Sequence, residues 1–376
     1  MKTILPHSQP LLKFWIPGAL FSLFAMSLGA HIQAAPKSAA ASRSSKSKST
    51  VPHLSRALRL RRHAFPDVTM GIPAAYTVML PVGWSASGKI EWQPVGEVPF
   101  PQQKIEINSP RKGRISFEPL MTFSYMEGPG MPTQGIPAPR NLPQWLIGAV
   151  AQTNPKIRNV QLIKSSRDTK AEAFMKNLEV STGGAGGMER EVHVIVLEYD
   201  EANLRRREEV SVTYVRFPPY LSANMNSQLW SLAPSGAFSA PASQFAAQRP
   251  MLVSVANTVR ATPQWHIQSQ AVIAEMSRRR VANNWELIKQ RGRNLSQLSD
   301  ADYAKYKRDT SGGDAAQRTR INTINETDDF KDTNGNIVNL PMHYHHVFSD
   351  GKGNYVLSNN SHDKPGELWK PIRPIK

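Results

Sequence analysis

Two runs decide the fold class: REVHVIVLEYD at Arg190–Asp200 and EEVSVTYVRF at Glu208–Phe217. Both are rich in β-branched and aromatic residues and alternate between apolar and polar side chains, the pattern of half-buried strands. The segment EANLRRR at positions 201–207 joins them. We therefore expect an antiparallel hairpin at the centre of a sheet.

Working outward, short alternating runs predict further strands, and runs with helical spacing predict helices between them. A Pro/Gly-rich stretch at 127–143 predicts a long loop. Strands interspersed with helices in this order favour an α+β fold, a sheet with helices on one or both faces. The predicted strands lie in 76–84, 89–95, 103–125 and 156–166, and the predicted helices in 144–152, 167–180 and 243–261.

The pattern changes after Pro263. Residues 263–330 predict a helical and polar connector, beginning with the poorly hydrophobic helix at 264–292. Residues 331–376 predict a small three-stranded β module. Asn334-Gly335 and the run Asp350–Gly353 are strong turn signals within it, and Trp369 is expected to pack back on its strands.

The N-terminus predicts export. Lys2 and Lys13 precede an apolar stretch from Phe14 to Ala30, and small residues follow at Ala34 and Ala35, as in a signal peptide at 1–34. An uncleaved membrane anchor is the alternative. The chain contains no cysteine, which excludes disulfides, thiolate metal sites and a lipid-attached cysteine. These features favour a bacterial periplasmic protein, with release to the medium second.

The chain is strongly basic, with a formal net charge of +17. Residues 35–63 predict a disordered basic arm, because they are Ala/Ser/Lys-rich and the first acidic residue of the chain is Asp67. We expect this arm to bind an anionic surface. A flexible spacer, or charge that serves only solubility, is the alternative. The candidate surface-binding residues are Lys46, Lys48, Arg56, Arg59, Arg61 and Arg62.

Two stretches resemble known families. The run VMLPVGW…IEW, then RISFEPLMTF, then the helix FAAQRPMLVSVANTVRA resembles PsbP-like domains over about residues 66–262. That resemblance implies a twisted antiparallel sheet flanked by helices, in a domain at 64–262 that binds or assembles rather than catalyses. Over about 265–372, the pattern of D…G..V.LP..Y.HV, D.KGNYVLS and a terminal Trp is similar to a C-terminal module of uncharacterised exported bacterial proteins.

A histidine cluster is the main candidate for metal binding. On a strand, His343 and His345 would point to one face, where two imidazoles can chelate Zn²⁺ or Cu²⁺. His362 is a candidate third ligand, with Asp363 as the alternative. A rim of ordinary histidines is the alternative. Asp332, Asn334 and Asn336 resemble the start of a calcium loop but lack its closing glutamate, so a plain turn is expected.

These observations favour an exported, non-catalytic binding or assembly protein of the bacterial envelope. Its expected partner is an envelope protein, a glycan or an anionic lipid surface, and no cofactor is expected beyond a possible transition metal. Two alternatives stay open: a metal-dependent hydrolase that uses the histidine cluster, and an extracellular nucleic-acid binder that uses arginines 278–293. Nucleic acid is the less favoured partner, because these arginines spread over several helix faces.

Overall fold

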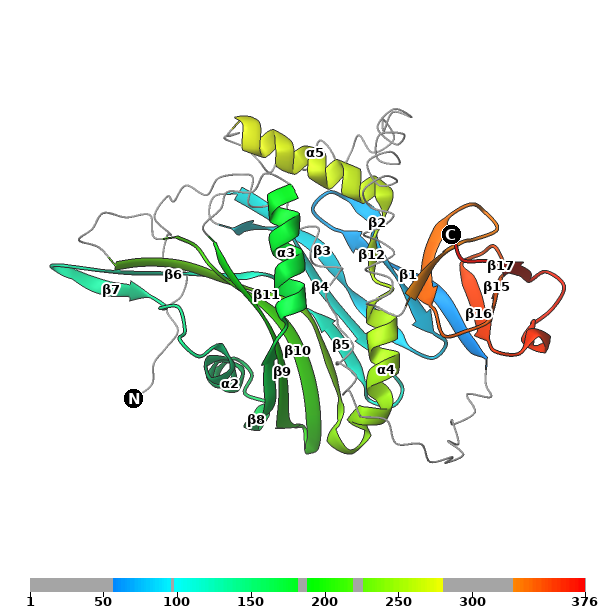
Figure 1. The fold of residues 1–376 in the computed structure, drawn as a ribbon, viewed down its shortest axis with the longest axis horizontal. Helices are drawn as coiled ribbons and strands as arrows, with labels where there is room; N and C mark the ends of the chain where they lie inside the picture. Colours follow the sequence, from blue (N-terminus) through cyan, green and yellow to red (C-terminus); the bar gives the residue numbers. More distant parts are fainter. Residues whose placement is uncertain (1–56, 96–97, 182–187, 219–225, 280–326, 376) are drawn as a thin grey trace, which may run out of the picture.

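The structure is a computed structural model, and it describes residues 57–95, 98–181, 188–218, 226–279 and 327–375. These residues form a mixed α/β fold built mainly of strands (Figure 1). One large, strongly curved sheet runs in the order β17-β15-β16-β1-β3-β4-β5-β11-β10-β9-β8, and a two-stranded sheet, β13-β14, accompanies it. The predicted signal peptide at 1–34 lies outside the described residues. No helix in the described ranges is both long enough and apolar enough to span a membrane.

The central hairpin forms as predicted, but its connection is much shorter. Strand β9 (Glu189–Glu201) pairs with β10 (Leu204–Arg216) in antiparallel register. Only Ala202 and Asn203 join them, both at positive φ (48° and 65°). Two such residues match the right-handed twist of paired strands. The loop expected at 201–207 is therefore wrong, and its three arginines belong to β10.

Strand β11 (Asn226–Pro241) pairs with β10 along most of its length. Strands β5 (Arg114–Phe117) and β6 (Met121–Gly128) both pair with β11 on its other side. Strand β7 (Met131–Gly135) forms a hairpin with β6 where a long loop was expected. Gly135 makes this possible: a Cβ there would lie 1.9 Å from the Ser124 carbonyl oxygen.

The N-terminal strands continue the sheet beyond β5. They are β1 (Leu58–Asp67), β2 (Ile72–Pro81), β3 (Ser85–Val95) and β4 (Val98–Asn108). Strand β1 begins inside the segment that was predicted to be a disordered arm at 35–63. Leu60 and Phe65 on β1 are buried, which explains why the backbone is ordered here despite the arginines at 59, 61 and 62.

Helices cover both faces of the sheet. Helix α2 (Leu142–Thr153) packs on one face, beside strand β8 (Ile157–Arg167) at the sheet edge. Its first turn is capped by the Asn141 side chain, which accepts a hydrogen bond from the Gln144 N–H at 3.1 Å. Helix α3 (Thr169–Ser181) follows β8 and packs against β9.

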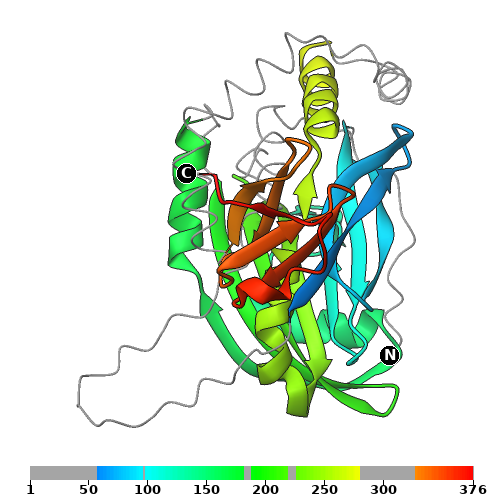
Figure 2. The same cartoon turned by 90° about the vertical axis from the view of Figure 1, so that its right-hand side faces the viewer.

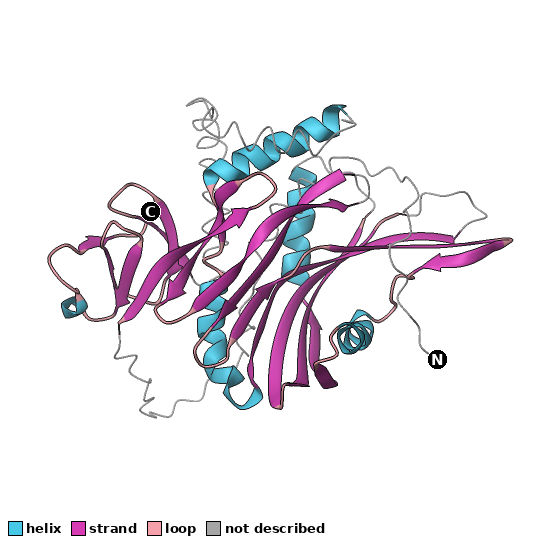
Figure 3. Ribbon diagram, turned by 180° about the vertical axis from the view of Figure 1, so that it is seen from behind, coloured by secondary structure: helices cyan, strands magenta, loops and turns pink. Residues whose placement is uncertain are grey.

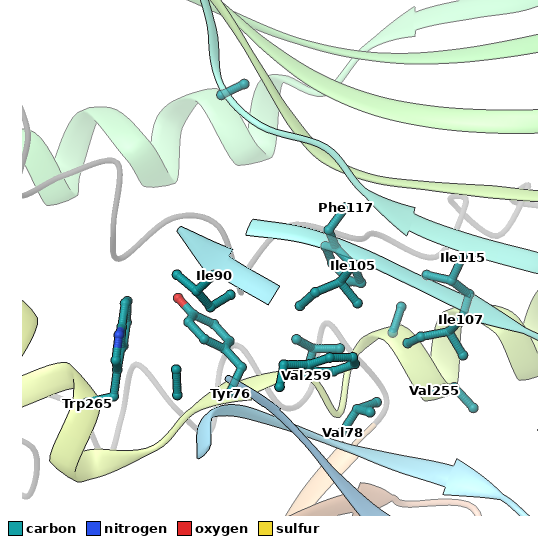
Figure 4. Packing of buried hydrophobic residues seen from close by; sticks show 14 of the residues in the cluster. Tyr76, Val78, Ile90, Ile105, Ile107, Ile115, Phe117, Val255, Val259 and Trp265 are labelled. Atoms are coloured by element: carbon teal, nitrogen blue, oxygen red, sulfur yellow. The ribbon is translucent and has the colours of Figure 1, made fainter. Parts of the chain in front are cut away.

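Helices α4 (Phe245–Ala256) and α5 (Pro263–Arg279) close the opposite face. Residues 242–244 form a short 3₁₀ turn before α4, and Arg260–Ala261 forms strand β12, paired with β2. The helix expected to reach Ala261 therefore ends at Ala256. Figure 4 shows the core beneath these helices, where Tyr76 and Val78 of β2 face Ile105, Ile107 and Phe117 of β4 and β5. Trp265 of α5 closes this core, so α5 belongs to the main domain and not to a separate connector.

The C-terminal strands also join the main domain. Strands β15 (His346–Ser349), β16 (Asn354–Ser358) and β17 (Lys370–Ile372) extend the large sheet through β16, which pairs with β1. Strands β13 (Thr327–Lys331) and β14 (Ile337–Pro341) form the two-stranded sheet beside them (Figures 2 and 3). A three-stranded module at 331–376 was predicted; the structure describes five strands between Thr327 and Ile372, and three of them continue the large sheet.

Candidate functional site

Three of the predicted surface-binding residues lie on strand β1 and are exposed: Arg59, Arg61 and Arg62. Arg59 and Arg61 share one face of the strand, and Arg62 lies on the other. Leu60 between them is 2% exposed and packs with Met79 and other residues of the C-terminal core. Because the buried Leu60 side chain packs in this core, the strand backbone that carries the three arginines is held in place. The structure therefore corrects the prediction that they belong to a flexible arm.

The β1 arginines carry charge that the described residues do not neutralise. Arg61 donates from Nη2 to the Trp84 carbonyl oxygen at 3.3 Å, and the Arg62 backbone N–H donates to the Gly353 carbonyl oxygen at 2.9 Å. No carboxylate in the described ranges pairs with any of the three. Burial and the charge of Arg61 lower the pKa of His63. The strand therefore presents arginine charge at neutral pH, without a contribution from His63. Lys46, Lys48 and Arg56 lie outside the described residues.

The predicted histidine site has a different geometry from the expected one. His343 and His345 lie in the turn between β14 and β15, which begins only at His346. The alternation that would point both imidazoles to one face is therefore absent, and that prediction is wrong. His345 uses its backbone N–H to bind the Asn359 side-chain oxygen at 3.1 Å. His362 lies in the 3₁₀ turn Ser361–Asp363, where its Nδ1 is 3.1 Å from the Asn360 Oδ1 atom.

Among the described residues, these histidines do not belong to a group of three potential metal ligands. In the part of the chain that the structure describes, no group of three His, Cys, Asp or Glu side chains is arranged to hold a metal ion. His343, His345 and His362 all belong to that part. The structure therefore does not unite the three residues that the hydrolase alternative requires.

The segment resembling a calcium loop is a turn between β13 and β14, as expected. Asp332 Oδ1 accepts hydrogen bonds from the backbone N–H groups of Asn334 (2.9 Å) and Asn336 (2.8 Å). Its Oδ2 accepts from the Asn336 amide at 3.1 Å. Both carboxylate oxygens therefore bind donors within the turn itself.

Sequence analysis missed a polar network on the face of the sheet that carries α2. Arg114 of β5 pairs with Glu201 (Nη1–Oε1, 3.3 Å) and donates to the Tyr199 hydroxyl at 3.1 Å. Tyr199 in turn donates a very short hydrogen bond to Glu208. Burial, and then the negative charge of Glu208, raise the pKa of Tyr199, so the phenol stays protonated. The residues come from β5, β9 and β10, and only strand pairing brings them together. Opposite charges pair within the network, so it holds the strands in register.

Comparison with known proteins adds no assignment: no family model matches the chain, no curated protein matches it in sequence, and no solved structure matches its fold.

Proposed function

We propose that this chain is an exported, non-catalytic binding or assembly protein of the bacterial envelope that is held against an anionic surface by basic residues near its N-terminus. One observation carries the proposal: Arg59, Arg61 and Arg62 are exposed on a rigid strand, and no described carboxylate pairs with them. Arginine charge that is not paired within the protein remains available to phosphate and carboxylate groups on another surface.

Two sequence features support the wider setting. The start of the chain has the three parts of a signal peptide, and the residues between it and Asp67 carry only positive charge. The resemblance to PsbP-like domains over about 66–262 supports a role in binding or assembly. The partner would be an envelope protein, a glycan or an anionic lipid surface.

The test is sedimentation of the purified protein with envelope fractions and with vesicles of phosphatidylcholine, with and without phosphatidylglycerol. Binding is expected at low salt and should weaken as salt rises, because screening reduces interactions between exposed charges. The triple variant Arg59→Gln, Arg61→Gln and Arg62→Gln should bind about tenfold less or weaker still.

A matched control removes equal charge elsewhere through Arg111→Gln, Lys170→Gln and Lys176→Gln, all at exposed positions. This control should retain more binding than the β1 variant. Equal loss of binding in both triple variants would show that binding depends on the net charge of the protein and not on the β1 arginines. Absence of binding to every envelope fraction and vesicle, or binding that persists at high salt, would reject the proposal.

A further inference from the structure

A second surface of the molecule is formed by a stretch of sequence without acidic residues. From Gly128 to Arg167 the chain contains no Asp or Glu, although it has 29 acidic residues in 376. Within this acid-free stretch, α2 lies beside β8 at one edge of the sheet, whereas β7 pairs with β6 on the other side of β11 (Figure 1). We call the outer side of α2 and β8 the α2–β8 surface.

The α2–β8 surface carries exposed cations without internal partners. Arg140 precedes α2, Lys156 follows it, and Arg158 and Lys164 lie on β8; all four are exposed. No described carboxylate forms an ion pair with any of them. The remaining cation, Arg167, is different, because Glu172 binds its guanidinium with two hydrogen bonds of 2.9 Å.

Two acidic side chains of β9, opposite Gln161 and Arg158 of β8, already have partners within the protein. Glu198 of β9 pairs with Arg205 (3.3 Å) and with Arg207 (2.6 Å). Asp200 pairs with Arg205 at 3.4 Å and accepts from the Asn159 amide at 2.7 Å. The positive charge of the α2–β8 surface is therefore not offset by neighbouring carboxylates.

The same surface exposes apolar side chains. Leu162 is 38% exposed and Ile163 is 46% exposed, and they are adjacent on β8. The pairing of β8 with β9 shifts between Leu162 and Lys164. Such a bulge breaks the alternation of side chains along a strand. It leaves two consecutive apolar residues at the sheet edge beside Lys164.

Helix α2 extends this surface without adding charge. Its sequence, LPQWLIGAVAQT, contains no ionisable side chain. Gln144, Ala151 and Gln152 are exposed, and a Cβ added at Gly148 would meet no atom within 4 Å. The side of α2 that faces away from the sheet is therefore open, small and uncharged, so it offers no electrostatic barrier to an anionic surface.

Cations alone fit any polyanion, whereas cations beside exposed aliphatic side chains fit a lipid headgroup layer, in which the apolar groups can be buried. A second copy of this chain is disfavoured, because β8 against β8 would oppose like charges. We propose that the α2–β8 surface docks on an anionic phospholipid bilayer. This deepens the proposed function, on which it rests, by assigning a lipid surface and a second contact site.

The experiment measures sedimentation of the full protein with phosphatidylcholine vesicles containing phosphatidylglycerol. Arg158→Gln with Lys164→Gln should weaken binding about tenfold or more. Leu162→Thr with Ile163→Thr, which keeps the net charge, should also weaken it severalfold. Both pairs of residues are exposed, so circular dichroism should confirm an unchanged fold.

Matched controls come from the opposite end of the sheet. Lys370→Gln with Arg373→Gln removes the same charge at β17. Ile337→Thr with Leu368→Thr removes two exposed aliphatic side chains, one on β14 and one in the turn before β17. Neither control should change binding by more than about twofold, because exposed substitutions elsewhere do not touch the docking surface.

The outcomes separate this inference from the proposed function. If the β8 variants bind vesicles as well as their controls do, the docking surface is rejected, and the proposed function stands if the β1 variant loses binding. Binding to envelope fractions but not to vesicles would also reject the lipid docking surface and leave the proposed function standing. Polyphosphate is the soluble probe: if it competes fully, and the Leu162 and Ile163 variant binds normally, the partner is a soluble polyanion and the lipid assignment is overturned.

Discussion

At the scale of single residues, Asp67 is a buried carboxylate that joins several elements of the fold. It is fully buried, and its carboxylate accepts four hydrogen bonds. Oδ1 accepts from the backbone N–H groups of Thr69 (2.9 Å) and Met70 (2.8 Å). Oδ2 accepts from the indole N–H groups of Trp92 (2.9 Å) and Trp265 (2.7 Å). A buried carboxylate needs such donors in place of water. Asp67 thereby connects β1, β3 and α5.

Substitution Asp67→Asn should destabilise the protein by about 3 kcal/mol or more. An asparagine amide would turn its own N–H donors toward either the two indoles or the two backbone groups, so buried donors would lose their acceptor. The measurement is urea unfolding followed by tryptophan fluorescence. Glu106→Gln changes an exposed carboxylate on β4. This control should leave the free energy of unfolding within about 0.5 kcal/mol of that of the wild type. Equal stability of both variants would show that the carboxylate is not needed.

At the scale of elements, the two C-terminal hairpins share one turn design. The runs FKDTNGNIV at 330–338 and FSDGKGNYV at 348–356 both place an aspartate before a turn that ends in Gly-Asn. Asp350 Oδ1 accepts from the backbone N–H groups of Lys352 (2.7 Å) and Asn354 (3.1 Å), and Oδ2 accepts from the Asn354 amide (2.6 Å). Asp332 makes the same set of bonds in the other hairpin. Gly353 and Gly335 both have positive φ (87° and 85°), which a glycine adopts without strain.

The Asp350 turn predicts a pH dependence. Burial alone would raise the pKa of Asp350, but hydrogen bonds from the Asn354 amide and from two backbone N–H groups outweigh it and lower that pKa. The stabilisation is therefore fully present above the unfolded-state pKa of about 3.9 and is lost as the pH falls through the lower folded-state pKa. Asp350→Ala should cost about 1 kcal/mol at neutral pH, and its difference from wild type should shrink in acid.

The measurement is thermal unfolding of the wild type and the Asp350→Ala variant from neutral pH to about pH 2. Glu367→Gln serves as the control, because this carboxylate is exposed in the same part of the fold. A difference between the wild type and the Asp350 variant that stays constant down to the lowest pH would contradict the role of the ionised carboxylate.

At the scale of the whole molecule, the C-terminal strands and the N-terminal strand β1 form one core. Leu60 of β1 packs with Tyr355 and Leu357 of β16, and all three are 2% exposed or less. Arg260 of β12 donates to the Asn339 side chain of β14 at 3.3 Å, and Asn339 donates to Asp329 of β13 at 2.9 Å. Contacts between distant parts of the sequence therefore join the C-terminal strands to the main sheet.

Leu357→Ala should lower the stability of the entire protein by about 3 kcal/mol, because truncating a fully buried leucine removes apolar contacts and leaves a cavity. The fluorescence of the main-domain tryptophans should move to a lower urea midpoint in a single transition. Leu368→Ala, at a side chain that is 85% exposed, should have little effect. Two transitions, with the first assigned to the C-terminal strands, would show that these strands unfold separately.

Local sequence patterns predicted the elements whose stability depends on neighbouring residues. The β9 and β10 runs, helices α2 and α3 and the Asn334-Gly335 turn follow from periodicity and turn chemistry, which need only neighbouring residues. The mixed α/β class follows from the same patterns. Strand β11 was not predicted, because NSQLWSLAPSGAFSAP contains prolines, glycine and small residues that disfavour a strand in isolation. Pairing with β10, β5 and β6 stabilises it.

Long-range packing determines which distant segments pair and which charged side chains have partners. The local sequence around the β1 arginines predicts a flexible arm, but Leu60 packs on β16, from the other end of the chain. Local patterns predict a separate module for the C-terminal strands, because β1, which joins them to the large sheet, lies far away in the sequence. The prediction that the His343 and His345 imidazoles share one face required both residues to lie on a strand, and β15 begins only after them. In each case long-range packing outweighed a local pattern, and local patterns carry no information about that packing.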